Sequence, residues 1–175
     1  MQMPDVWDVV IRLLAATLVA GIVGLDREFR QKPAGLRTHM LVGLGSAAFM
    51  LFALRLSLGL ADANGLDGIR TDPIRIAEGI IGGIGFLGAG TIIQSRGNVQ
   101  GLTTAAGVWT AGAIGVACGA GQFFLAICVM VVALICLLPV QLVESMVQRQ
   151  ARRAGVRSNE ASKETKTIDS SSVRR

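Results

Sequence analysis

The chain has 175 residues, 51% of them hydrophobic, and a formal net charge of +5. Its mean hydropathy of +0.55 is too high for a soluble domain of this length, and the hydrophobic residues occur in long blocks. The basic residues flank these blocks instead of gathering on a soluble face, which argues against a nucleic-acid-binding protein. The composition therefore indicates an integral membrane protein.

Five hydrophobic blocks predict five membrane-spanning helices. A bilayer core about 30 Å thick requires about 20 apolar residues in a helix. The sequence shows no alternating pattern of the kind found in β-barrel strands, so we expect an all-α polytopic membrane protein. The five expected spans are residues 6–25, 40–60, 74–93, 102–119 and 123–143.

The first block has the length of an export signal but lacks its other features. Asp5 and Asp8 stand where a signal peptide carries Lys or Arg, and the block is followed by DREFRQK instead of a small-residue cleavage site. We therefore expect residues 6–25 to remain in the protein as a span.

The basic residues alternate between the segments that connect the spans. Residues 26–39 hold four Lys or Arg and residues 144–175 hold eight, whereas the segments 61–73 and 94–101 hold one each and 118–122 none. Because cytoplasmic loops carry the excess of Lys and Arg, we expect the N-terminus outside and the C-terminus in the cytoplasm.

The last part of the chain differs in composition from the rest. Residues 148–175 lack aromatic residues and contain few large apolar ones, so they cannot bury a core. We expect a membrane domain over residues 1–147 and a disordered basic cytoplasmic tail over 148–175. The arginines that begin this tail either contact anionic lipid or only orient the chain.

Small residues are concentrated in the third and fourth spans, where they favour close helix packing in lipid. The segment GIIGGIGFLGAGTII begins with a G-x-x-x-G pair and carries glycine on several faces, which is typical of a helix at the centre of a bundle. The first span also has Ala16, Ala20 and Gly24 at intervals of four. A broken helix that lines an ion path is the alternative for the glycine-rich segment. The expected packing residues are Gly79, Gly83, Gly85, Gly88, Gly90, Gly107, Ala111 and Gly115.

Four charged residues lie within or beside the hydrophobic blocks: Arg12, Arg55, Arg75 and Glu78. An unpaired charge near the bilayer centre costs about 3 kcal/mol or more, so such residues usually pair or face a cavity. We predict that Glu78 pairs with Arg12 or Arg55 in the bundle interior. One alternative is that these charges are structural, either as an ion pair or with the Arg55 side chain extended outward to the membrane surface. The other is that the four charged residues form a layer that provides a polar path from the outside.

Two segments of the chain resemble each other. GIVGLDREFRQKPAGLRT and GFLGAGTIIQSRGNVQGLTT both start with G-x-x-G, cross a polar turn and end in GLRT or GLTT at the start of a returning helix. Thr38 and either Thr103 or Thr104 are candidate N-caps of the returning helices. With Arg37 beside one of them, the two helix starts could instead hold a phosphate, a carboxylate or a lipid headgroup.

The sequence shows no catalytic or metal-binding pattern. It lacks a nucleophile paired with a base, a phosphate-binding loop and zinc spacing, and the three cysteines do not follow metal-binding motifs. The acidic residues Asp62, Asp67 and Asp72 do not have the spacing of a calcium loop, and His39 is interpreted as an interfacial residue. We expect no enzymatic activity, no cofactor and no bound metal.

The segments PAGLRTHMLVGLGSA, GIGFLGAGTII and GLTTAAGVWTAGAIGVACGAG together resemble the MgtC/SapB family of bacterial membrane proteins. The resemblance implies a multi-pass, non-enzymatic protein of the inner membrane that is linked to growth in low magnesium and, in founding members, to virulence. Some members are described as modulating other membrane complexes, including the ATP synthase. The motif residues that carry over as candidate functional residues are Asp26, Arg27, Glu28, Arg37, Thr38, Asn98, Gly101, Thr103, Thr104 and Trp109.

The chain departs from the virulence-type members of this family in two ways. It has a tail where they have a soluble domain, so it resembles the short SapB type, and Asp26 stands where Glu is expected. The resemblance implies a protein linked to magnesium homeostasis that modulates another membrane complex or membrane energetics; the alternative is a small cation transporter or channel. Its expected partners are membrane lipids, another membrane complex or a second copy of the chain.

Overall fold

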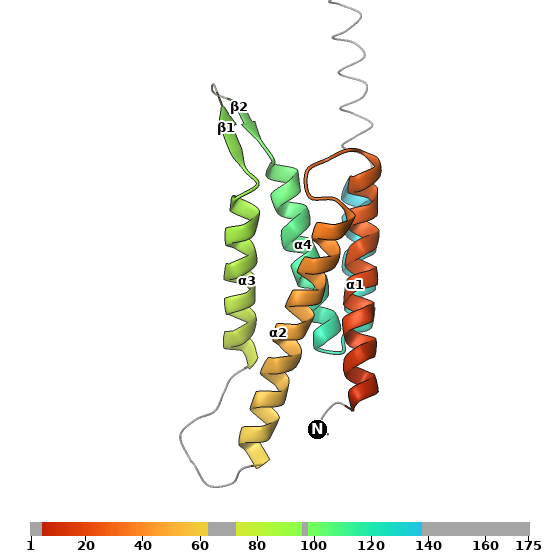
Figure 1. Ribbon diagram of the computed structural model, residues 1–175, viewed down its shortest axis with the longest axis vertical. Coiled ribbons are helices and arrows are strands. Elements are labelled where there is room, and N and C mark those ends of the chain that lie inside the picture. The colour runs from red at the N-terminus through yellow and green to blue at the C-terminus, as the bar shows by residue number, and fades with distance from the viewer. Residues whose placement is uncertain (1–4, 63–72, 96–97, 138–175) are drawn as a thin grey trace, which may run out of the picture. The chain divides into compact units, whose positions relative to one another are not determined.

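The structure is a computed structural model that describes residues 5–62, 73–95 and 98–137. It contains the helices α1 (Val6–Phe29), α2 (Leu36–Asp62), α3 (Pro73–Ala89) and α4 (Leu102–Gly119), and a hairpin of strands β1 (Ile93–Ser95) and β2 (Asn98–Gln100) (Figure 1). A further helix covers Phe123–Leu137. The chain divides after Leu134 into two compact units, and α1 to α4, the hairpin and the site described below belong to the first.

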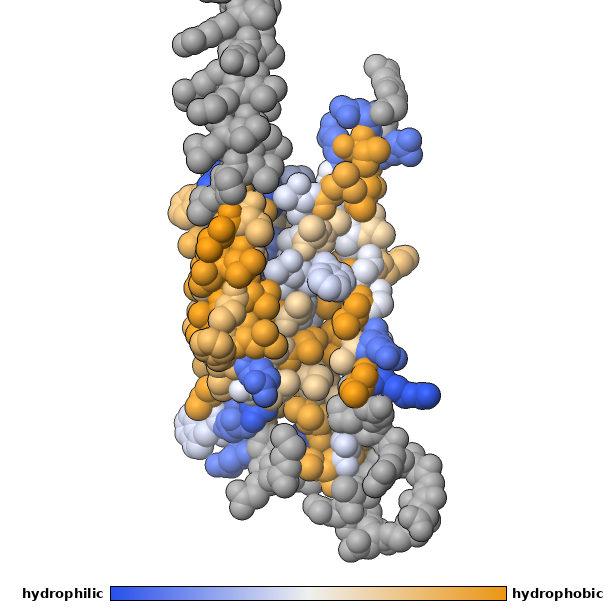
Figure 2. All heavy atoms as spheres, turned by 180° about the vertical axis from the view of Figure 1, so that it is seen from behind, coloured by the Kyte–Doolittle hydropathy of each residue, from blue (hydrophilic) through white to orange (hydrophobic). Residues whose placement is uncertain are grey.

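The described part of the chain is mostly helical, and three of its helices are long and apolar enough to cross a membrane. These are Val6–Phe29, Leu36–Leu58 and Leu102–Gly119, and Phe123–Leu137 is a shorter apolar helix. Large apolar side chains are exposed along their length, such as Leu18 (63%), Phe49 (63%) and Phe124 (82%). Figure 2 shows hydrophobic residues over much of one face, with hydrophilic residues mainly toward the ends. This surface agrees with a helical membrane protein. The number of spans and their orientation remain predictions.

The helices run alternately up and down (Figure 1). One end of the helices, called the hairpin end below, contains the end of α1, the turn of residues 30–35, the start of α2, and the hairpin that joins α3 to α4. The opposite end contains the start of α1 and the end of α4, and is called the N-terminal end. The turn of residues 30–35 and the hairpin, which belong to two segments that the sequence assigned to the same side, both lie at the hairpin end.

Helices α1, α2 and α4 pack backbone against backbone. A methyl group added at Gly43 of α2 would lie 2.6 Å from the Ala20 Cβ atom and 2.9 Å from the Ala16 carbonyl oxygen of α1. A methyl group at Gly119 of α4 would lie 2.7 Å from the Ala47 carbonyl oxygen of α2. The small residues expected on the first and fourth spans therefore do lie at helix contacts, and α4 has more buried residues than α1.

Helix α3 lies at the edge of this packing, in contact with α4 and, less extensively, with α2. A methyl group at Gly79, Gly82, Gly83 or Gly85 would meet no other atom within 4 Å, and only Gly88 approaches a neighbour, the Ala105 carbonyl oxygen at 3.4 Å. The prediction that the third span forms the centre of the bundle is therefore wrong. The backbone is continuously helical from Pro73 to Ala89, so the glycines do not break the helix.

The third helix ends four residues earlier than the expected span. The Thr91 N–H and hydroxyl both donate to the Gly88 carbonyl oxygen, at 2.9 Å and 2.7 Å, and turn the chain into the hairpin. Strands β1 and β2 pair antiparallel, with Ile93 opposite Gln100. Gly101 then adopts φ of +90°, and a side chain there would overlap the Thr91 carbonyl oxygen, so this turn requires glycine.

Candidate functional site at the hairpin end

The motif residues from three segments of the chain come together at the hairpin end. Arg27 and Glu28 lie in the last turn of α1, Arg37 and Thr38 in the first turn of α2, and Thr104 in the first turn of α4. These turns meet because α1, α2 and α4 pack closely along their small residues. The hairpin end is therefore the candidate functional site.

A buried arginine forms the centre of this site. Arg27 is 2% exposed and Thr104 is 3% exposed, and the Arg27 Nη2 atom donates a hydrogen bond of 3.0 Å to the Thr104 hydroxyl oxygen. The bond joins the end of α1 to the beginning of α4, across 77 positions of the chain. Burying a guanidinium is costly unless hydrogen bonds compensate it, so this contact constrains how the two helices meet.

His39 is buried beside this contact. Its side chain is fully buried in the first turns of α2, and its Nδ1 atom lies 2.9 Å from the Gly35 carbonyl oxygen. Its Nε2 atom faces α4, where a methyl group at Gly107 would lie 3.2 Å away, and it has no hydrogen-bond partner among the described residues. The interpretation of His39 as an interfacial residue is therefore wrong. The glycine opposite it, Gly107, is the sequence feature that could have indicated that His39 is buried.

Glu28 caps the start of α2 from the end of α1. Its Oε2 atom accepts a hydrogen bond of 3.0 Å from the Leu36 N–H, which is one of the free donors in the first turn of a helix. A side chain at Gly35 would overlap this carboxylate, so the glycine of the GLRT motif makes room for the cap. The turn of residues 30–35 also has positive φ angles at Gln31 (52°) and Ala34 (56°).

The threonines are not the helix caps that the sequence predicted. Thr38 lies within the first turn of α2, whose first N–H is capped by Glu28. The N-cap of α4 is Gly101, which has no side chain to accept a bond, so Thr103 and Thr104 are not N-caps either. Thr104 instead accepts the bond from Arg27, because its position one turn into α4 faces the end of α1.

We predict that Glu28→Ala destabilises the protein by about 0.5–2 kcal/mol, the usual cost of losing a helix N-cap. Glu28→Gln keeps a side-chain oxygen that can accept from Leu36 and is expected to lose less. The measurement is the free energy of unfolding in mixed micelles, followed by circular dichroism. Equal losses in the two variants would contradict the capping role.

The other motif residues at this end do not join the buried contact. Asp26 pairs with Arg30, the C-cap residue of α1, at 2.8 Å. Asn98 and Thr103 are exposed, and Trp109 is 50% exposed on α4. These residues are therefore placed near the site without a described role in it.

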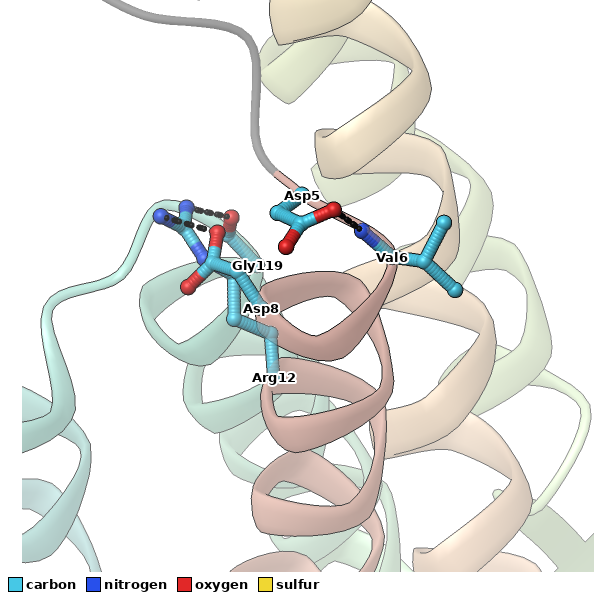
Figure 3. Close-up of polar contacts among 5 residues, drawn as sticks. All are labelled: Asp5, Val6, Asp8, Arg12 and Gly119. Atoms are coloured by element: carbon cyan, nitrogen blue, oxygen red, sulfur yellow. Dashed lines mark hydrogen bonds and ion pairs between the residues drawn. The ribbon is translucent and has the colours of Figure 1, made fainter.

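The charged residues expected in mid-membrane do not form one layer. The Arg12 guanidinium contacts the Asp8 carboxylate at 2.8 Å and donates to the Gly119 carbonyl oxygen at 2.9 Å, so it ties the start of α1 to the end of α4 (Figure 3). A cation at a helix C-terminus is favourable because the last carbonyls carry partial negative charge. Asp5, also shown there, caps α1 through the Val6 N–H at 2.7 Å.

The predicted pairing of Glu78 with Arg12 is wrong, because the Arg12 guanidinium contacts Asp8 and the Gly119 carbonyl oxygen instead. Glu78 and Arg75 are exposed on α3, and Arg55 is exposed on α2. Within residues 5–62, 73–95 and 98–137, Glu78 makes no ion pair. Helix α3 lies at the edge of the packing, and its main contacts are with α4 and α2 instead of α1. Asp67, Asp72 and the tail 148–175 lie outside the described residues.

The apolar helices, their exposed hydrophobic surfaces and the polar contacts at both ends define a helical membrane protein. The chain matches the MgtC family over residues 13–146, and it belongs to that family. It is 46% identical over 118 residues to the Escherichia coli K12 protein called "Putative magnesium transporter YhiD", and 45% identical over 114 residues to "Protein MgtC" of Salmonella typhimurium LT2. A Haemophilus influenzae protein is 34% identical over 157 residues, or 89% of this chain and 65% of that protein.

The matched region covers 67% of this chain and 54% of the E. coli protein, and 65% of this chain and 44% of the Salmonella protein. The chain therefore spans about half the length of these two relatives. No solved structure matches it. The motif residues of the hairpin end all lie within the region that matches the family.

Proposed function

We propose that this chain is a non-enzymatic protein of the bacterial inner membrane that supports magnesium homeostasis by acting on another membrane complex. Membership in the MgtC family and the names of its relatives support the link to magnesium. The excess of basic residues in segment 26–39 supports an orientation with the hairpin end in the cytoplasm. The association with virulence rests on the family resemblance alone.

The observation that carries the proposal is a small-residue face on α3 that no other described residue covers. Gly82, Gly85 and Ala89 are exposed, and a methyl group at either glycine would meet nothing within 4 Å. Phe86 beside them is 85% exposed. Each glycine weakens a helix by about 1 kcal/mol relative to Ala, and in lipid small residues compensate for that loss only where another backbone comes close. We call this the outer face of α3 and assign it to a helix of the partner complex.

The packing of α1, α2 and α4 favours a regulatory role over a cation-transport role for this protein. At Gly43, Gly115 and Gly119 even a methyl group would overlap a neighbouring helix, so these helices leave no room between them for a hydrated cation at these levels. A transporter is the second candidate, favoured by the printed name of the E. coli relative. Purified protein in liposomes separates the two functions, because saturable Mg²⁺ flux by this chain alone would contradict the regulator.

We predict that Gly82→Leu and Gly85→Leu each abolish rescue of a deletion strain grown in low Mg²⁺, because the added side chains prevent a partner helix from approaching. Ala48→Leu is the matched control. Ala48 is exposed on α2, so the leucine adds a side chain of similar size away from the outer face of α3. Growth is compared at equal membrane levels of each variant. Full rescue by both glycine variants would refute the role of this face.

A further inference from the structure

An apolar groove runs between α2 and α3, on a face of α3 that adjoins its outer face. It has a volume of about 730 Å³, and only three of its thirteen lining residues are polar, namely Arg37, Thr38 and Ser46. The Ser46 hydroxyl donates to the Val42 carbonyl oxygen of its own helix at 2.7 Å. Gly45 of α2 and Gly79 and Gly83 of α3 give the walls a smooth surface, with nothing within 4 Å of a methyl group at any of them.

The groove has the depth of a single lipid leaflet. Its lining extends from Arg37 to Phe49 on α2 and from Leu87 to Ile76 on α3. At 1.5 Å per residue this is about 17 Å, whereas half of a hydrocarbon core 30 Å thick is about 15 Å. The length of the groove therefore fits one extended acyl chain of a lipid in a single leaflet.

The groove also has a charged end. Arg37 lines it at the hairpin end, where its side chain is exposed, and Arg37 makes no ion pair within the described parts of the chain. The carboxylates on the neighbouring turn have other partners, since Asp26 contacts Arg30 and Glu28 accepts from Leu36. The opposite end of the lining, at Phe49 and Ile76, is apolar. This polarity matches a molecule with an anionic head and an apolar chain.

We propose that the groove between α2 and α3 binds one anionic glycerophospholipid from the leaflet at the hairpin end. Its phosphate contacts the Arg37 guanidinium, and one acyl chain lies along the glycine-lined walls toward Phe49 and Ile76. The lipid fills the space that separates α3 from α2 over this length. It leaves the outer face of α3 free, so lipid binding and partner binding use different sides of the same helix.

The test is native mass spectrometry of the purified full chain after delipidation and addition of phosphatidylglycerol, phosphatidylethanolamine or inorganic phosphate. We expect one retained phosphatidylglycerol, less phosphatidylethanolamine and no retained inorganic phosphate. Arg37→Gln is expected to lower phosphatidylglycerol retention about fivefold, the effect of one basic residue near anionic lipid. Gly83→Leu fills the groove and should abolish retention, whereas Gly82→Leu adds the same side chain on the outer face and should not.

Unchanged retention in Gly83→Leu, or equal retention of both lipids by the wild type, would overturn the proposal. A dimer that Gly83→Leu dissociates, without a bound lipid in the wild type, would overturn it in favour of a second copy in the groove. Because Gly83 has open space around it, the variant should fold; if it does not, Gly79→Val obstructs the same wall with less bulk. Loss of lipid binding with normal growth in low Mg²⁺ would separate this site from the proposed function.

Discussion

Gly115→Ala is expected to destabilise the folded protein by about 1–3 kcal/mol, the usual cost of overpacking a close-packed interior. A methyl group at this position of α4 would overlap the Gly43 carbonyl oxygen of α2 and lie 2.7 Å from the Ser46 Cβ atom. Neither group can move aside without separating the two helices, because one is backbone and the other is attached directly to it. The measurement is the free energy of unfolding in mixed micelles, followed by circular dichroism.

The matched control is Gly85→Ala on α3, where a methyl group meets nothing within 4 Å. Because alanine is the better helix former by about 1 kcal/mol, this variant should be as stable as the wild type or more stable. The two substitutions are chemically identical, so opposite effects would isolate the helix contact. A loss of stability in Gly85→Ala as large as that in Gly115→Ala would show that α3 packs against a neighbour after all.

The contrast between these glycines shows what small-residue spacing predicts. The intervals of four on the first and fourth spans identified faces that lie at helix contacts, because a repeat of four keeps residues on one side of a helix. The same signal was strongest in the third span, which lies at the edge. Spacing shows that a face permits close approach, but whether another helix occupies it depends on the rest of the bundle.

The residues of the candidate site could be predicted from the sequence, but the contacts between them could not. The motif resemblance selected Arg27 and Thr104, but 77 positions separate them, and no local pattern pairs the end of one helix with the start of another. The sequence likewise paired Glu78 with Arg12 or Arg55, although the Arg12 guanidinium reaches across to Gly119. A side chain as long as arginine can bond several ångströms from its own backbone, so its place in a hydrophobic block does not select its partner.

Thr104→Val is expected to destabilise the protein by about 1–3 kcal/mol, because the buried Arg27 guanidinium loses the hydroxyl that accepts its Nη2 hydrogen bond while the packing volume is kept. Thr104→Ser keeps the hydroxyl and should lose much less. Thr103→Val is the matched control, since Thr103 is the exposed neighbour on the same turn of α4. The free energy of unfolding of each variant is measured as for Gly115→Ala.

Arg27→Met removes the charge and completes a double-mutant cycle with Thr104→Val. If the two residues act through their contact, the double variant should be less destabilised than the sum of the single variants, with a coupling of at least about 0.5 kcal/mol. We also expect Thr104→Val to weaken rescue of growth in low Mg²⁺, because this bond fixes how α1 and α4 meet at the candidate site. Strict additivity, or equal losses in Thr103→Val and Thr104→Val, would refute the contact as the organising feature of the hairpin end.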